Sequence, residues 1–276
     1  MLERTVWLRK VKESDTMVKE SMQIARRRST KMYKEEFSRT ALLLGEDAID
    51  RLAQCRVAVF GVGGVGGYVC EALARCGIGH LDLIDSDVVS ISNINRQIIA
   101  THSSVGKYKT DVMKERILDI NPDAEVHVFH CFFLPENADD FAFDQYDYVV
   151  DAVDTVTAKI ALVEKCEKHQ VPIICSMGAG NKLDASKFRV ADIYQTKVCP
   201  LAKVMRRELK KRGISKCKVV YSEELPIKPV QEEATAMQEK DMVRKKQVPG
   251  SVAFVPSVAG LIVAGEVVQD LIRIKA

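Results

Sequence analysis

Short apolar runs alternate with amphipathic stretches along the chain from Arg56 to Gly178. The apolar runs have the length and β-branched content of buried strands, and they read RVAVFGV, HLDLID, EVHVFH, YDYVVDAVD and VPIICSMG. The stretches between them have helical spacing; they include VGGYVCEALARCG, which Gly77 should end, GKYKTDVMKERILDINP, which Pro122 should end, and residues 157–169. Because strands and helices at this pitch form right-handed crossovers, the pattern predicts an α/β fold with a mostly parallel sheet and helices on both faces.

The pattern changes after Lys187. KFRVADIYQ and KCKVVYS are expected strands on either side of a basic helix, PLAKVMRRELKKRG, and a last helix from about Pro256 to Ile272 should dock on the sheet. We expect this part to form a partly antiparallel C-terminal extension. The segment at about residues 223–250 is polar, contains three prolines and has no clear period, which predicts a flexible loop.

The N-terminal region differs from the rest of the chain in charge. Residues 1–31 contain nine Lys or Arg against four Asp or Glu and show no strand pattern, so we predict a basic extension that need not be ordered. The stretch FSRTALLLGEDAIDRL has helical spacing and precedes the first strand, and residues 32–276 are predicted to form one domain. The net charge of the chain is only +3, so nucleic-acid binding can be argued only from local patches.

Cysteine usage and hydropathy indicate where the protein is found. The eight cysteines form no C-x-x-C pair, so neither a zinc ribbon nor a redox dithiol is indicated, and free thiols are typical of a reducing cytosol. The N-terminus MLERTVWLRK lacks the apolar core of a secretion signal. The apolar run from Val252 to Gly265 is too short to span a bilayer. We therefore expect a cytoplasmic protein with no stable membrane insertion.

A glycine-rich turn, GVGGVG, lies between the first strand and the helix that follows it. Its glycines Gly61, Gly63, Gly64 and Gly66 would let the backbone approach phosphate oxygens at a helix N-terminus. Asp85 follows Gly66 by nineteen residues, at the end of the second strand, where a carboxylate can bind ribose hydroxyls. These features predict a Rossmann-like nucleotide site. NAD, FAD and ATP all fit them, and a tight turn without a ligand is the alternative.

The stretch DSDVVSISNINRQ, residues 85–97, carries more polar groups than NAD binding requires. Asn93 and Arg96 are followed by VGKYK, so an amide, a guanidinium and the ammonium of Lys109 could converge at the carboxyl end of the sheet. Extra cations indicate more phosphate charge, as in a triphosphate whose leaving pyrophosphate must be neutralised. The same residues could instead close a solvated loop through Asn and Arg hydrogen bonds.

Taken in order, GVGGVG, DSDVVSISNINRQ, VGKYK and DAVDT resemble the ubiquitin-activating-enzyme superfamily, whose bacterial members MoeB and ThiF adenylate carboxylates with ATP. The resemblance runs from about Phe37 to Gly180. It implies ATP and Mg²⁺ as cofactors and a homodimer. It also implies specific roles: nucleotide binding for Asp85, through ribose, and for Asp87; phosphate binding for Asn93, Arg96 and Lys109; magnesium binding for Asp154; and for Arg39 a reach into the partner subunit's site. The plainer alternatives are a helix-capping carboxylate at Asp154 and a surface arginine at position 39.

The later half of the chain bears on which carboxylate is activated. Sulfur-carrier members of the superfamily usually have two zinc-binding C-x-x-C pairs, and this chain has none. SMGAGNKLDASKFRVADIYQTKVCPLAKVMRRELKKRGI, KVVYSEE and PGSVAFVPSVAGLIVAGEVVQDLI resemble the tRNA threonylcarbamoyladenosine dehydratase branch. This resemblance implies ATP-dependent dehydration of threonylcarbamoyladenosine in tRNA through an acyl-adenylate. The alternatives are activation of the C-terminal Gly-Gly of a sulfur-carrier protein, an NAD-dependent oxidoreductase, and a non-catalytic nucleotide-binding subunit of a heterodimer.

Two further features lie in and beside the predicted basic helix, and the first of them could bind a tRNA substrate. Residues 203–218 contain one acid, Glu208, and eight basic residues, at positions 203, 206, 207, 210, 211, 212, 216 and 218. Phosphate contacts by these side chains would release counterions and make binding salt-dependent, although a solvated basic face is the alternative. Cys199 precedes Pro200, so its sulfur should lie at a helix N-terminus, where a thiolate is favoured. A covalent role for Cys199 is conceivable; capping or packing is the alternative.

Overall fold

The computed structural model describes residues 35–230 and 249–273. The chain divides into two compact units, residues 1–43 and 44–276. The first unit contributes η1 (Glu35–Phe37) and most of α2 (Ser38–Leu44) to the described residues. The predicted basic extension, residues 1–31, lies outside the described residues, as does most of the predicted loop at about 223–250, and the predicted single domain over residues 32–276 stays a prediction.

The second unit is built from alternating strands and helices. Its strands are β1 (Arg56–Phe60), β2 (His80–Ile84), β3 (Glu125–Phe129), β4 (Tyr148–Asp151), β5 (Ile173–Ser176), β6 (Phe188–Asp192) and β7 (Lys218–Ser222). Its α-helices are α3 (Glu46–Leu52), α4 (Gly66–Arg75), α5 (Lys109–Ile120), α6 (Val156–His169), α7 (Pro200–Lys211) and α9 (Pro256–Arg273). Short 3-10 helices are η2 (Ile91–Asn93), η3 (Pro135–Asp140), η4 (Phe143–Gln145), η5 (Ala185–Lys187) and η6 (Ile193–Gln195).

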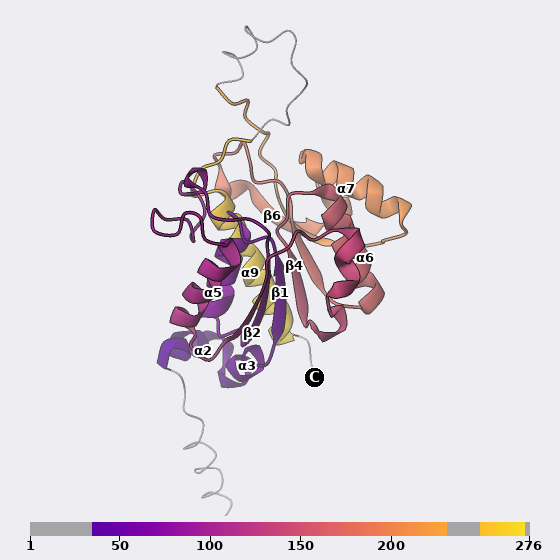
Figure 1. The fold of residues 1–276 in the computed structure, drawn as a ribbon. Helices are drawn as coiled ribbons and strands as arrows, with labels where there is room; N and C mark the ends of the chain where they lie inside the picture. Colours follow the sequence, from indigo (N-terminus) through magenta and orange to yellow (C-terminus); the bar gives the residue numbers. More distant parts are fainter. Residues whose placement is uncertain (1–34, 231–248, 274–276) are drawn as a thin grey trace, which may run out of the picture. The chain divides into compact units, whose positions relative to one another are not determined.

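One seven-stranded sheet, ordered β3-β2-β1-β4-β5-β7-β6, forms the centre of the second unit (Figure 1). All neighbouring strands pair in parallel except β6 and β7, which pair antiparallel from Phe188 opposite Ser222 to Asp192 opposite Lys218. The α/β fold with a mostly parallel sheet and a partly antiparallel C-terminal extension is therefore confirmed.

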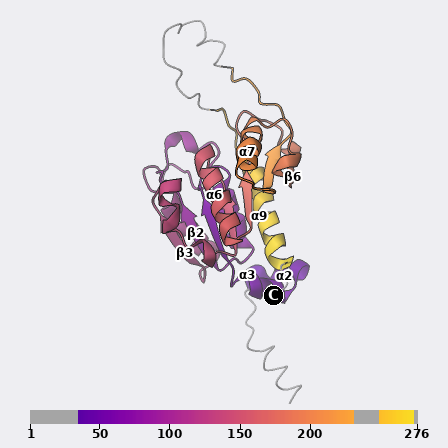
Figure 2. The same ribbon diagram turned by 90° about the vertical axis from the view of Figure 1, so that its right-hand side faces the viewer.

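Helices cover both faces of this sheet, as Figures 1 and 2 show. Helices α4, α5 and α9 pack on one face, where the largest apolar core joins them to the strands. Helices α6 and α7 pack on the other face, which is why β1, β4 and β7 are almost fully buried. An edge-to-face cluster of phenylalanines fills the core beside β1, and it contains Phe60, Phe133, Phe141 and Phe143.

The strand order reverses between β1 and β4, and this reversal determines where a ligand can bind. The chain builds outward from β1 to β3 and then returns to place β4 on the other side of β1. Loops at the carboxyl ends of these two central strands diverge and leave a crevice, which is the usual binding place in open α/β sheets. The glycine turn follows β1 and the sequence Ala152–Val153–Asp154 follows β4, so both border that crevice.

Local signals in the sequence explain most element boundaries. Gly77 takes a left-handed φ of 86° just after α4, and α5 ends before Pro122, both as predicted. The helical stretch over residues 37–52 is interrupted at Gly45, whose φ of 87° no helix allows, so it forms α2 and α3 instead of one helix. The predicted last helix is confirmed as α9, which runs one residue further, to Arg273.

Candidate functional site

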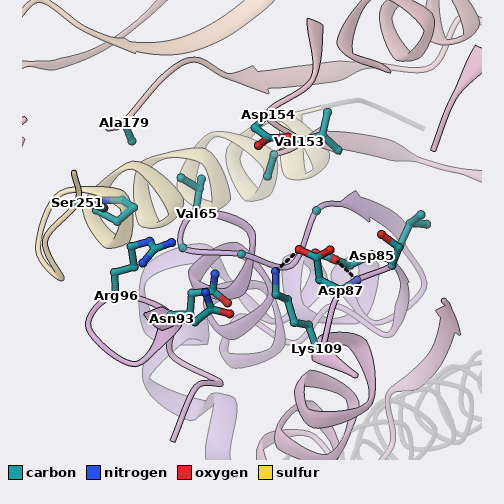
Figure 3. Close-up of a pocket in the computed structure, with 18 of the residues that line it drawn as sticks. Val65, Asp85, Asp87, Asn93, Arg96, Lys109, Val153, Asp154, Ala179 and Ser251 are labelled. Carbon is teal, nitrogen blue, oxygen red and sulfur yellow. Dashed lines mark hydrogen bonds and ion pairs between the residues drawn. The ribbon is translucent and has the colours of Figure 1, made fainter. Parts of the chain in front are cut away.

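A cavity of about 430 Å³ opens at the carboxyl edge of the sheet (Figure 3). Segments that follow five successive parallel strands line it: the glycine turn after β1, residues 85–87 after β2, 131–133 after β3, 152–154 after β4 and 179–180 after β5. Every ionisable or amide residue predicted for the site in this unit lines this one cavity: Asp85, Asp87, Asn93, Arg96, Lys109 and Asp154. The fold thus brings together side chains that are up to 69 positions apart in the sequence.

The four glycines of the turn differ in the space that a side chain would find, and at Gly64 a Cβ would lie 3.3 Å from the Cβ of Pro256. A Cβ on Gly66 would lie 1.8 Å from the carbonyl oxygen of Gly61, and a Cβ on Gly61 would lie 2.7 Å from the carbonyl oxygen of Ala152, so both are required for close backbone packing. A Cβ on Gly63 would meet only the amide nitrogen of Gln97, at 3.7 Å. The fold therefore leaves room at Gly63, on the cavity wall beside the N-terminus of α4, where phosphate oxygens can approach.

Asp85 lies at the end of β2 and clamps two loops together. Its Oδ2 accepts the backbone N–H of Val62 at 2.7 Å, and its Oδ1 accepts the N–H of Asp87 at 2.9 Å. A carboxylate offers about four lone-pair directions, so both oxygens keep capacity for a donor from the cavity. Asp85 can thus order the glycine turn and bind ribose hydroxyls at the same time.

Lys109, the first residue of α5, forms an ion pair with Asp87. Its Nζ lies 2.7 Å from Oδ2 of Asp87; the lysine side chain is 7% exposed and the aspartate side chain 63% exposed. The sequence predicted a site for both residues but gave no indication of this pairing. A phosphate that enters the cavity would have to compete with the Asp87 carboxylate for the Lys109 ammonium, and this carboxylate can turn into solvent.

Asn93 and Arg96 are partly engaged with their own loop. Asn93 Oδ1 accepts the N–H of Ser90 at 3.1 Å, and Nη1 of Arg96 donates to the carbonyl of Ser92 and to Oδ1 of Asn95, both at 2.8 Å. These bonds are the loop-closing contacts that the sequence left open as an alternative. They leave the amide NH₂ of Asn93 and the Nε and Nη2 groups of Arg96 as donors beside the cavity.

Asp154 reaches the cavity from the β4 side. It is exposed, it accepts a hydrogen bond from its neighbour Thr155 at 3.2 Å, and Figure 3 shows it across the cavity from Asn93 and Arg96. Mg²⁺ is usually held by one or two carboxylates together with substrate phosphates, and an exposed carboxylate beside the glycine turn fits that chemistry. Arg39 lies on α2 in the other unit, where its side chain is exposed, and its role stays a prediction.

Several lining residues were not singled out from the sequence. Gln97 is 6% exposed, and its Oε1 has no hydrogen-bond partner within the described ranges. Phe132 is 47% exposed and forms part of the wall after β3, next to Cys131. The sequence contains a signal for both residues. Gln97 ends the NINRQ motif, and Phe132 follows a predicted strand whose carboxyl end must lie at the same edge of the sheet as the glycine turn.

Some side chains of the basic segment, residues 203–218, are exposed on one face of α7, and others contact the rest of the protein. Lys203, Arg207 and Lys210 are exposed and spaced by four and three residues, so they share one face of α7. Hydrogen bonds from Lys211, Arg212 and Arg207 lower the pKa of Glu208 to about 2, so its negative charge offsets part of the helix's charge. Two other basic residues of the segment, Arg206 and Lys218, form contacts within the protein instead of facing solvent on this side of α7.

Arg206 donates to the carbonyl of Thr196 at 2.9 Å, and Lys218, on β7, pairs with Asp270 and Glu266 of α9. The basic surface that is available to a ligand is therefore smaller than the sequence suggested.

Cys199 is the N-cap residue of α7, as expected, but it is 3% exposed and is not among the described residues that line the cavity.

Membrane-spanning helices and preformed metal clusters are both absent from the described residues. No helix in these ranges is both long and apolar enough to cross a membrane. No cluster of three or more His, Cys, Asp or Glu side chains that could hold a metal ion occurs in them either.

Comparisons with known proteins agree on one family. The chain is 46% identical over 242 residues to the tRNA threonylcarbamoyladenosine dehydratase of Bacillus subtilis, and the match covers 86% of this chain and 95% of that protein. Its fold is similar to that of the E. coli tRNA N6-threonylcarbamoyladenosine dehydratase TcdA in complex with AMP, with a TM-score of 0.77 and 34% identity, covering 88% of this chain and 96% of that one. The same E. coli protein in complex with ATP gives a TM-score of 0.77 at 33% identity, with the same coverage of both chains. The profile of the ThiF family matches residues 37–275, and the chain belongs to the ThiF family.

Proposed function

We propose that this protein is an ATP-dependent tRNA threonylcarbamoyladenosine dehydratase. The observation that carries the proposal is the single cavity in which the glycine turn, Asp85, Arg96, Lys109 and Asp154 meet. The relatives support the same activity, because the B. subtilis and E. coli proteins bear that name and the E. coli protein was solved with ATP and with AMP. We also infer that the protein works in the cytoplasm, where its free thiols would stay reduced.

The chemistry explains why ATP is needed. The carboxylate of threonylcarbamoyladenosine is a poor electrophile, because a direct attack would have to expel oxide. In the proposed reaction, one carboxylate oxygen attacks the α-phosphorus of ATP, pyrophosphate leaves, and an acyl-adenylate forms. A carbamoyl atom of the same side chain then attacks the acyl carbon and expels AMP, which closes a five-membered ring with net loss of one water. Tethered closures of this kind reach effective molarities of about 10⁵ to 10⁸ M, so the protein needs mainly to activate and orient the substrate.

The residues of the cavity supply that activation. The backbone N–H groups at the glycine turn and the cations of Arg96 and Lys109 would neutralise the phosphates, and Asn93 would donate to them through its free amide hydrogens. Asp85 and Asp87 would bind the nucleotide, Asp85 through the ribose. Mg²⁺ held by Asp154 and the phosphates would add positive charge where pyrophosphate departs.

Pyrophosphate exchange tests this proposal against its alternatives. The protein is incubated with ATP, Mg²⁺ and radiolabelled pyrophosphate, with tRNA from a strain that carries threonylcarbamoyladenosine, with tRNA lacking that modification, or with a sulfur-carrier protein ending in Gly-Gly. We expect exchange only with the modified tRNA, and the modified nucleoside should lose the mass of one water. Exchange that requires the carrier would instead support carrier activation. The absence of exchange in every mixture would exclude an adenylating enzyme.

We further propose a homodimer in which Arg39 of one subunit serves the site of the other. An arginine supplied in trans is worth roughly 10³ to 10⁵ in rate in other phosphoryl-transfer enzymes, which sets the scale expected for Arg39→Ala. Mixing the Arg39→Ala and Asp154→Ala chains should restore exchange, because a mixed dimer has one site that contains both residues. Mixed dimers that stay as inactive as either parent would show that Arg39 acts within its own subunit or not at all.

We also propose that the exposed face of α7 binds tRNA phosphates. Lys203→Glu combined with Lys210→Glu should weaken tRNA binding and reduce the slope of log K against log salt by roughly one for each phosphate that the variant no longer binds. Binding is measured by filter retention between low and moderate salt.

Lys114→Glu with Lys168→Glu changes the net charge equally on α5 and α6 and serves as the control. If both double variants weaken tRNA binding to the same extent, the effect comes from net charge, and the α7 face is not the contact.

A further inference from the structure

A fully buried ion pair lies directly behind the wall of the cavity. Lys159 of α6 and Asp151 at the end of β4 are both 0% exposed. The lysine Nζ donates to Oδ1 and Oδ2 of Asp151, each at 3.0 Å, and to the backbone carbonyl of Ser176 at 2.6 Å. The ammonium group is therefore fully satisfied by two neighbouring strand ends, and neither charged group contacts solvent.

Stability alone does not explain this pair. Moving two charges out of water carries a desolvation penalty that their attraction often fails to exceed, and apolar replacements of similar volume are frequently as stable or more stable. Lys159 also lies in the first turn of α6, since its N–H bonds to the carbonyl of Thr155 at 3.0 Å. The positive end of a helix dipole disfavours a cation there. The pair is thus held at a place that is costly on two counts.

The hydrogen bonds of this ion pair connect the ends of β4 and β5, and the loops that follow these two strands form part of the cavity wall. Asp151 is followed at once by the wall residues 152–154, and its Oδ1 also accepts the N–H of Val153 at 3.2 Å. Ser176 ends β5, and the chain continues from it into the wall residues 179–180. One ammonium therefore links the ends of β4 and β5 where their paired residues stop, at Asp151 opposite Cys175. Through Asp151 and the Val153 N–H, it also contacts the backbone that leads to Asp154.

We propose that Lys159 is a positioning residue for the nucleotide site, acting through Asp151 on the loop that carries Asp154. The inference rests on the proposed function, because it assigns Lys159 to the site that binds ATP. Lys159 itself does not line the cavity, so its removal would alter the site only by releasing the loops.

The test uses variants that separate the fold from the site. Lys159→Met leaves the Asp151 carboxylate buried without its cation and is expected to lower the melting temperature. Lys159→Met with Asp151→Asn removes both charges at nearly constant volume and should restore much of that loss. In this double variant, the dissociation constant of ATP measured calorimetrically with Mg²⁺ should still rise by about 10- to 100-fold, the range seen when residues that orient metal ligands are removed. Pyrophosphate exchange should fall correspondingly.

A matched control is present at the other end of the sheet. Lys218, at the amino end of β7, donates to both carboxylate oxygens of Asp270, at 3.0 and 2.8 Å, so Lys218→Met with Asp270→Asn removes a lysine–aspartate pair away from the cavity. Glu266, the second partner of Lys218, stays in this variant as a partly exposed carboxylate. We expect its affinity for ATP to match that of the wild type. Wild-type affinity in the Lys159/Asp151 double variant, or an equal loss in both double variants, would overturn the inference. ATP binding needs no tRNA, so this outcome is distinct from a failure of the tRNA-dependent exchange that tests the proposed function.

Discussion

Replacing Asp154 by alanine is expected to lower pyrophosphate exchange by on the order of 10³-fold while the protein stays folded. Asp154 is exposed, and the hydrogen bond that its side chain accepts within the described residues comes from the hydroxyl of the adjacent Thr155, so the fold loses little when it is removed. The proposed site would lose the carboxylate that we assign to Mg²⁺. The pyrophosphate that leaves would then carry charge that Arg96 and Lys109 alone must balance.

This prediction is checked by exchange rate and by circular dichroism on the same samples. Asp144→Ala, which changes an exposed acid on η4, is the control and should exchange at the wild-type rate. Raising the concentration of Mg²⁺ should recover part of the activity of Asp154→Ala if the residue holds the ion. Wild-type exchange by Asp154→Ala would remove the magnesium assignment.

Gly66→Ala is expected to lower the free energy of unfolding by about 3 kcal/mol, the upper end of the range for overpacked cores. It is also expected to abolish ATP binding. The new Cβ would lie 1.8 Å from the carbonyl oxygen of Gly61, 2.9 Å from its carbonyl carbon and 3.3 Å from the Cβ of Ala152. Backbone atoms cannot rotate away as a flexible side chain can. Strand β1 and helix α4 must therefore separate, which opens both the core and the glycine turn.

Gly63→Ala is the matched comparison, and it separates binding from folding. Its Cβ would touch only Nε2 of Gln97, at 3.7 Å, and no left-handed φ is required at this position. The free energy of unfolding in urea should stay near that of the wild type. ATP binding should weaken on the order of tenfold, equal to roughly 1.4 kcal/mol, because the methyl group occupies the place of a phosphate. Unchanged ATP affinity in Gly63→Ala would show that phosphates do not approach this part of the turn.

The sheet and the position of the site could be predicted because local signals agree with one another. Apolar runs with β-branched residues became the strands, and Gly77 and Pro122 ended the helices where expected. Since the carboxyl ends of parallel strands share one edge, motifs after the first, second and fourth strands had to meet. The residues of the cavity were therefore predictable as a group.

The pairing of side chains could not be predicted, because it depends on contacts between distant segments. Nothing local indicates that Lys109 pairs with Asp87 or that Lys218 leaves the basic segment to meet Asp270 on α9. Lys159 reads as an ordinary surface lysine in an amphipathic helix, and only the packing of α6 against β4 and β5 buries it. Gly45 was visible in the sequence, but a glycine within helical spacing does not by itself predict a break.

The contact between Lys109 and Asp87 has a consequence for the catalytic cycle. The Asp87 carboxylate neutralises the lysine in this structure, at 2.7 Å, and is itself mostly exposed. In the proposed reaction, the triphosphate of ATP would replace the Asp87 carboxylate as the anionic partner of the Lys109 ammonium. The gain in binding free energy would therefore be smaller than with an unpaired lysine. After the reaction, the Asp87 carboxylate would compete with the phosphate products for the lysine, and it would speed their release relative to a site with an unpaired lysine.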